Sequence, residues 1–176
     1  MKKPMLTYNY LALMHAFRNH ADYVLERDKN RYLNSIGMMQ EYCTLRIDGG
    51  RQTGKTEAVT EFCKDWLAEG NDVIILSTKL ASSIDTVSKI KRRYTEFQQI
   101  GKETGRKIIP MTIRDYLSGS NKLRGIFLNR VLIVIDEPMR IPEMYKFYYE
   151  YEQSVQMCRM YAENKELPLF FVMGIQ

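Results

Sequence analysis

The sequence predicts an α/β protein built on a mainly parallel sheet of five or more strands, with helices on both faces. Apolar runs of strand length alternate with helical patterns, which is typical of strands that are covered on both sides. One of these runs leads into a glycine-rich loop followed by a helix. We expect a helical N-terminal addition over residues 1–42, packed on a compact P-loop core over residues 43–176.

Five apolar runs are expected to form the strands, at residues 42–47, 73–76, 107–112, 131–135 and 169–173. The run at 131–135 consists of five branched aliphatic residues and is the clearest of them. Proline cannot donate a hydrogen bond to a neighbouring strand, so Pro110 places the run at 107–112 at an edge of the sheet or at the end of its strand.

Helical patterns fill the segments between these runs. Residues 5–40 are expected to be helical, with Gly37 as the break. Further helices are predicted directly after the glycine-rich loop, and at residues 80–99, 113–117 and 143–163.

The carboxyl ends of these strands are expected to form one functional edge. Ligands of open parallel sheets bind beyond the carboxyl ends of the strands. The segments that would meet there are 49–56, 77–78, Thr112, 136–137 and 174–176.

Residues 49–56 read Gly-Gly-Arg-Gln-Thr-Gly-Lys-Thr, a complete G-x-x-x-x-G-K-[ST] phosphate-binding motif. The glycines allow the backbone N–H groups to surround phosphate oxygens, Lys55 adds a mobile charge, and the Thr56 hydroxyl can ligate Mg²⁺. The alternative is a glycine-rich turn that caps an ordinary helix. The residues expected to contact a nucleoside triphosphate are Gly49, Gly50, Arg51, Gln52, Thr53, Gly54, Lys55 and Thr56.

Asp136 and Glu137 follow the aliphatic run at 131–135. A carboxylate at the end of a buried strand can hold Mg²⁺ opposite Thr56, and Glu137 can deprotonate an attacking water. The alternative is the polar end of a strand that enters a turn. Because a phosphotransferase must exclude water from the γ-phosphate, the acidic pair favours hydrolysis over a small nucleoside or nucleotide kinase.

Arg51 lies inside the loop, where its guanidinium could stabilise charge in the transition state as an arginine finger supplied in cis. It could equally point to solvent or pair with an acid. Gln176 follows the last strand and could sense the γ-phosphate, or simply follow the strand without a role. The guanine-specific motif Asn-Lys-x-Asp is absent from the sequence, which favours ATP.

The net charge of +5 is unevenly distributed. The basic residues of the segment 89–107 suit DNA or RNA, or form a solvated helix face. They are Lys89, Lys91, Arg92, Arg93, Lys102, Arg106 and Lys107, and a later group contains Lys122, Arg124 and Arg130. The aromatic residues of 145–161 could stack on bases or pack in the core. No apolar run approaches the length of a membrane span, so we expect a cytoplasmic protein without a membrane partner.

The segment 50–56 resembles the phosphate loop of the large terminase subunits of tailed phages, which often read Arg-Gln-x-Gly-Lys-Thr. The segment 123–125, Leu-Arg-Gly, followed by the acidic strand and by Ile141-Pro142, is similar to the corresponding terminase stretch. The strand at 73–76 with Ser77-Thr78 occupies the place of the second conserved sequence block that terminases share with helicases. These similarities extend over residues 43–176.

The resemblance implies a RecA-like ATPase core of the additional-strand catalytic-glutamate class. Carried over by position, it implies Lys55 and Thr56 on phosphate and Mg²⁺, Asp136 on the metal, Glu137 as the base and Arg51 as the cis finger. It further implies DNA packaging or a helicase-like motor function, in the host cytoplasm if the protein is phage-encoded.

Terminases continue into a nuclease domain and helicases into a second RecA-like domain, and we expect no counterpart of either within residues 1–176. Gly174-Ile175-Gln176 stands in place of the Thr-rich coupling motif. A detached ATPase domain, an accessory ATPase and a segment of a longer protein would all fit this pattern. The site could be completed by a second copy or by a partner protein. A nucleotide-responsive binding protein with little turnover is the further alternative.

Overall fold

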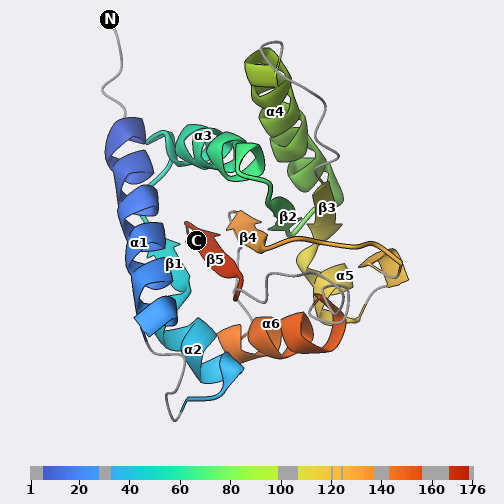
Figure 1. The fold of residues 1–176 in the computed structure, drawn as a ribbon. Coiled ribbons are helices and arrows are strands. Elements are labelled where there is room, and N and C mark those ends of the chain that lie inside the picture. The colour runs from blue at the N-terminus through green and yellow to red at the C-terminus, as the bar shows by residue number, and fades with distance from the viewer. Residues whose placement is uncertain are drawn as a thin grey trace, which may run out of the picture.

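The computed structural model describes residues 6–27, 33–98, 107–119, 121–123, 125–136, 143–155 and 167–174. Helices and strands alternate around one sheet (Figure 1). In chain order the elements are α1 (Thr7–Arg27), α2 (Ser35–Tyr42), β1 (Thr44–Ile47), α3 (Lys55–Ala68), β2 (Asp72–Ser77), α4 (Leu80–Gln98), β3 (Ile108–Thr112), α5 (Ile113–Leu117), the 3-10 turn η1 (Asn121–Leu123), β4 (Val131–Asp136), α6 (Met144–Glu150), the π-helical turn η2 (Tyr151–Val155) and β5 (Leu169–Met173).

The described strands form a five-stranded sheet in the order β1-β5-β4-β2-β3, and every neighbouring pair is parallel. The predicted α/β class with a parallel sheet is confirmed. The three inner strands are continuous apolar runs, because both of their faces are covered. Pro110 lies in β3, which pairs only with β2, so its predicted place at a sheet edge is confirmed.

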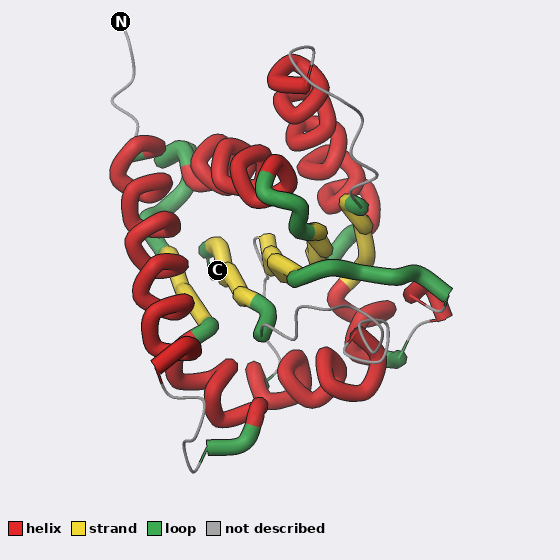
Figure 2. The backbone as a smooth tube through the Cα atoms, in the orientation of Figure 1, coloured by secondary structure: helices red, strands yellow, loops and turns green. Residues whose placement is uncertain are grey.

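Helices cover both faces of the sheet (Figure 2). On one face, Phe171 of β5 packs on Phe62 of α3 with ring centroids 4.9 Å apart. On the other face, Phe170 packs on Tyr148 of α6 at 5.1 Å and on Tyr151 at 6.3 Å. Successive residues of a strand point to opposite faces, so this aromatic pair connects the two helical layers through one strand.

The amino edge of the sheet is held together by a buried carboxylate. Asp72, at the start of β2, accepts hydrogen bonds from the backbone N–H groups of Lys107 (2.8 Å) and Asn129 (2.7 Å). Its own carbonyl accepts from Nε1 of Trp66 at 3.0 Å. The starts of β2, β3 and β4 are thereby tied to one another and to α3.

The expected helix break at Gly37 is wrong. Gly37 lies in the first turn of α2, and its N–H donates to the side chain of Asn34 at 2.8 Å. Asparagine is a strong N-cap, because its side chain satisfies an N–H that the first helical turn leaves unpaired. The first helix instead ends at Arg27. The expected helix at 143–163 is described only to Val155, and its last residues lie outside the described part of the chain.

Among the helices that the structure describes, none is both long enough and apolar enough to cross a membrane.

Candidate nucleotide site

The glycine-rich loop connects the end of β1 to the start of α3. Gly50 (φ 72°), Gln52 (φ 57°) and Gly54 (φ 92°) have left-handed backbone conformations, and Gly54 is the N-cap of α3. A loop of this kind can gather backbone N–H groups on one side, and the start of a helix adds unpaired N–H groups with partial positive charge. The strand, loop and helix therefore have the backbone chemistry of an anion site.

Lys55 is held between this loop and the end of β5. Only 8% of its surface is exposed, and its Nζ donates a hydrogen bond to the carbonyl oxygen of Gly50. Its stem passes over Gly174, where an added Cβ would lie 3.3 Å from Cε and 3.8 Å from Nζ. Gly174 has a φ of 75°, so both its backbone and the nearby lysine favour glycine at this position.

Asp136 ends the central strand β4 on the face that α3 and α4 cover. The hydroxyl of Thr86, on α4, donates a hydrogen bond to Oδ2 of Asp136 at 3.1 Å. Burial, and to a smaller extent the charge of Asp136, raises the pKa of the Cys63 thiol on α3 above its ordinary value. The carboxylate thus lies under the helix that begins with Lys55 and Thr56.

The predicted convergence at the carboxyl edge is confirmed for the described residues. Asp136 is in register with Met173 of β5 and with Ser77 of β2, and Met173 is in register with Ile47, where β1 leads into the loop. Thr112 is level with Ser77. Its side chain accepts a hydrogen bond from the N–H of Asp115 at 2.9 Å, so Thr112 caps α5.

Two predicted site residues, Glu137 and Gln176, lie outside the described residues. Arg51 and Gln52 are exposed on the loop, and Thr56 is half-buried in the first turn of α3. Among the residues that the structure describes, Thr56 and Asp136 are the candidates predicted from the sequence to hold Mg²⁺. A hydroxyl and a carboxylate fit a hard cation that keeps several waters and also binds phosphate oxygens.

The sequence did not reveal that the start of α1 packs on the loop (Figure 1). The N–H of Leu6 donates to the carbonyl of Thr53 at 3.0 Å, and the Tyr10 hydroxyl donates to Oγ1 of Thr53 at 3.3 Å. Glycine is needed where this helix approaches the loop. A Cβ at Gly54 would lie 2.1 Å from Oγ1 of Thr7.

Replacing Gly49 with alanine is expected to lower the free energy of unfolding by about 2 kcal/mol, as overpacking of a filled site does. An added Cβ would lie 1.9 Å from the Tyr10 hydroxyl oxygen. Urea unfolding followed by the fluorescence of Trp66, the single tryptophan, measures the effect. In a Tyr10→Phe background the same change should cost about half as much, because the colliding oxygen is gone.

Gly50→Ala is the matched control. No atom lies within 4 Å of an added Cβ at Gly50, so only its left-handed backbone opposes alanine, at about 1–2 kcal/mol. This cost should be the same with Tyr10 and with Phe at position 10. An equal cost of Gly49→Ala in both backgrounds would contradict the contact between α1 and the loop.

Several of the basic residues proposed for a polyanion have internal roles. Arg93 of α4 forms ion pairs with Glu57 and Glu61 of α3. Arg130 is 4% exposed, lies 2.7 Å from a carboxylate oxygen of Asp22, and stacks on the ring of Trp66.

Lys102, Arg106 and Arg124 lie outside the described residues. Among the other basic residues that the structure describes, Nζ of Lys107 donates to the carbonyl of Phe127. Lys89 pairs with Asp85 at 2.8 Å, and Lys122 pairs with Asp115 at 2.7 Å. The interpretation of the basic segment 89–107 as a binding site for DNA or RNA is therefore weakened. Lys91 and Arg92 are the basic residues of α4 that are exposed.

Of the aromatic residues late in the chain, Tyr161 lies outside the described part, and most of the described ones pack in the core. Phe147, Tyr148 and Tyr151 are buried, whereas Tyr145 and Tyr149 are exposed and stack on each other with centroids 6.4 Å apart.

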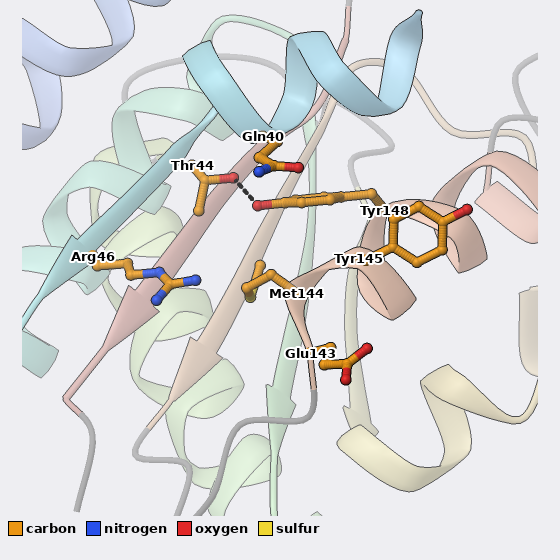
Figure 3. A pocket seen from close by; sticks show the side chains of 7 residues that line it. All are labelled: Gln40, Thr44, Arg46, Glu143, Met144, Tyr145 and Tyr148. Carbon is orange, nitrogen blue, oxygen red and sulfur yellow. Dashed lines mark hydrogen bonds between the residues drawn. The ribbon is translucent and has the colours of Figure 1, made fainter.

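A hollow of about 690 Å³ lies between α2, β1 and α6, on the face of the sheet opposite α3 (Figure 3). The Thr44 and Tyr148 hydroxyls are 2.7 Å apart, and burial raises the pKa of Tyr148. Arg46 reaches in from β1, whereas the ring of Tyr145 points away from the Thr44–Tyr148 pair (Figure 3). The residues that line the hollow are Gln40, Thr44, Arg46, Glu143, Met144, Tyr145 and Tyr148.

Comparison with known proteins gives one informative similarity. No family model matches the chain. The chain is 35% identical over 180 residues to an uncharacterized 25.0 kDa protein encoded in the regB-denV intergenic region of Enterobacteria phage T4. The similarity covers 99% of this chain and 81% of the phage protein. The name of that relative states no activity, so the chemistry must be argued from the residues.

Proposed function

We propose that this chain, which belongs to the same family as the 25.0 kDa protein of phage T4, is a P-loop nucleoside triphosphatase that binds ATP with Mg²⁺ and hydrolyses it. The observation that carries this proposal is the shared place of the glycine-rich loop and Asp136. Both lie at the carboxyl edge of one parallel sheet, and only β5 separates their strands.

The strand order supports a RecA-like core of the additional-strand class. In β1-β5-β4, one strand stands between the loop-bearing strand and the acidic strand. Gly174, the residue that follows β5, lies beside the Lys55 side chain. The carboxyl end of β5 is therefore close to the Lys55 ammonium group, which is proposed to bind the β- and γ-phosphates.

The roles follow from chemistry and position. The loop N–H groups and Lys55 would bind the β- and γ-phosphates. Thr56 and Asp136 would hold Mg²⁺, which would supply positive charge to neutralise the phosphates. Glu137 orients a water molecule and takes its proton as the water oxygen attacks the γ-phosphorus and ADP leaves. Arg51 stabilises the charge that develops on the γ-phosphate oxygens.

We further propose that ATP turnover is coupled to a nucleic acid, in an accessory or motor ATPase similar to those of terminases and helicases. The exposed residues Lys91 and Arg92 on α4 support this part of the proposal. α4 begins three residues after the end of β2 and packs on α3, so a ligand on α4 would be mechanically connected to the nucleotide site.

The test is phosphate release by the purified chain with ATP and Mg²⁺ and without any acceptor. We expect turnover that requires Mg²⁺, and stimulation by single-stranded or duplex DNA that falls when Lys91 and Arg92 are both replaced by alanine. ADP that appears only when a nucleoside or nucleoside monophosphate is added would instead show a kinase. Tight binding without phosphate release would show a nucleotide-responsive binding protein.

A further inference from the structure

Thr86 is a buried hydroxyl that contacts the candidate metal ligand from a different element of the fold. It lies in the second turn of α4, is 3% exposed, and donates to Oδ2 of Asp136 at 3.1 Å. The two residues are 50 positions apart in the sequence. The sequence predicted only a helix over residues 80–99 and did not single out Thr86.

The direction of this hydrogen bond is unusual for a helical hydroxyl. Serine and threonine in helices commonly donate to a carbonyl three or four residues earlier in their own helix. On α4, Ser83 bonds to the carbonyl of Leu80 at 2.9 Å, and Ser88 bonds to that of Ile84 at 2.8 Å. The Thr86 hydroxyl instead donates its hydrogen bond to Asp136 at the end of β4.

The helix that carries Thr86 is itself fixed to the helix that carries the loop residues. Arg93, two turns further along α4, forms ion pairs with Glu57 and Glu61 of α3. Thr86 therefore holds its position relative to Lys55 and Thr56 as well as to Asp136. A carboxylate that must meet a metal ion needs such support, because partners in the outer shell orient the ligand.

We propose that Thr86 is the positioning residue that orients the Asp136 carboxylate for Mg²⁺ in the nucleotide complex. This inference rests on the proposed function. Besides packing in the fold, Thr86 then lowers the Mg²⁺ concentration that nucleotide binding requires.

The first experiment compares Thr86→Val, which keeps the shape and removes the hydroxyl, with Thr86→Ser, which keeps the hydroxyl. The readout is the Mg²⁺ concentration that half-saturates binding of a fluorescent, slowly hydrolysed ATP analogue. We expect an increase of about tenfold for valine, within the range for loss of an outer-shell partner, and a value near wild type for serine. Ser88→Ala, which removes an exposed hydroxyl from the same helix, should leave the value unchanged.

A second measurement tests the contact without nucleotide. In a double-mutant cycle of urea unfolding, Thr86→Val should destabilise the wild-type chain more than the Asp136→Ala chain. Additive effects, or an unchanged Mg²⁺ requirement in Thr86→Val, would overturn the assignment of Thr86. An absence of Mg²⁺-dependent binding in the wild-type chain would overturn the proposed function, and with it this assignment, while the unfolding cycle would still report whether the hydrogen bond exists.

Discussion

Replacing Lys55 with alanine is expected to reduce ATP hydrolysis at least 100-fold and to weaken ATP binding. Removing one preorganised group that stabilises transition-state charge lowers kcat about 100- to 1,000-fold. Lys55 is almost fully buried at the junction of the loop, α3 and the end of β5, so its charge is fixed beside the loop that is proposed to bind phosphate. Phosphate release and calorimetric titration with ATP measure the two effects.

Lys64→Ala is the control from the same helix. Lys64 is nine residues further along α3, where it lies 2.7 Å from Glu61 and 3.6 Å from Asp65. Its removal should leave turnover within twofold of wild type, because a partly exposed ion pair contributes little. Equal turnover in Lys55→Ala and Lys64→Ala would show that the loop is a helix-capping turn, the alternative that the motif left open.

Lys55→Arg is expected to reduce ATP hydrolysis almost as much as Lys55→Ala. The Cε atom of Lys55 already lies near Gly174, and the planar guanidinium group is larger than an ammonium group. Restoring the positive charge without restoring its position should therefore recover little activity. Recovery by arginine would mean that charge alone acts at this position and that the packing against Gly174 is unimportant.

The sequence was sufficient to predict the sheet because its signal is local. Residues 131–135 are aliphatic on both sides of the strand, and β4 occupies the centre of the sheet with both faces covered. The same reasoning predicted that Pro110 lies at a sheet edge or at the end of its strand, and that the loop and Asp136 share one edge of the sheet. These predictions depend on strand geometry, which neighbouring residues determine.

The contacts that support the loop could not be predicted in this way, because they join residues far apart in the chain. Tyr10 meets Thr53 across 43 positions, and Thr86 meets Asp136 across 50. The count of positive charges in 89–107 did not show that Arg93 is used within the fold. Which charges pair internally depends on how helices pack, and a single sequence does not contain that information.

Substitutions of Asp136 and Glu137 are expected to affect metal binding and proton transfer separately. Glu137→Gln should lower the turnover of ATP about 100-fold or more while Mg²⁺-dependent binding stays close to wild type, because general base catalysis contributes about 100- to 10,000-fold. Asp136→Asn should instead raise the Mg²⁺ concentration needed for binding, since an amide oxygen is a weaker ligand than a carboxylate. Phosphate release and Mg²⁺ titration of ATP-analogue binding distinguish the two results.

The two substitutions are nearly isosteric, so the fold should tolerate both. Asp136 is half-buried and already accepts the Thr86 hydroxyl, a hydrogen bond that an amide oxygen can also accept. Glu143→Gln is the matched control, because this exposed carboxylate precedes α6 and lines the hollow on the opposite face of the sheet. If Glu137→Gln and Glu143→Gln hydrolyse ATP equally fast, the base is another group, and the proposed mechanism is wrong even if the loop binds nucleotide. If Asp136→Asn leaves the Mg²⁺ requirement unchanged, the metal is held elsewhere, and the role of Thr86 fails with it.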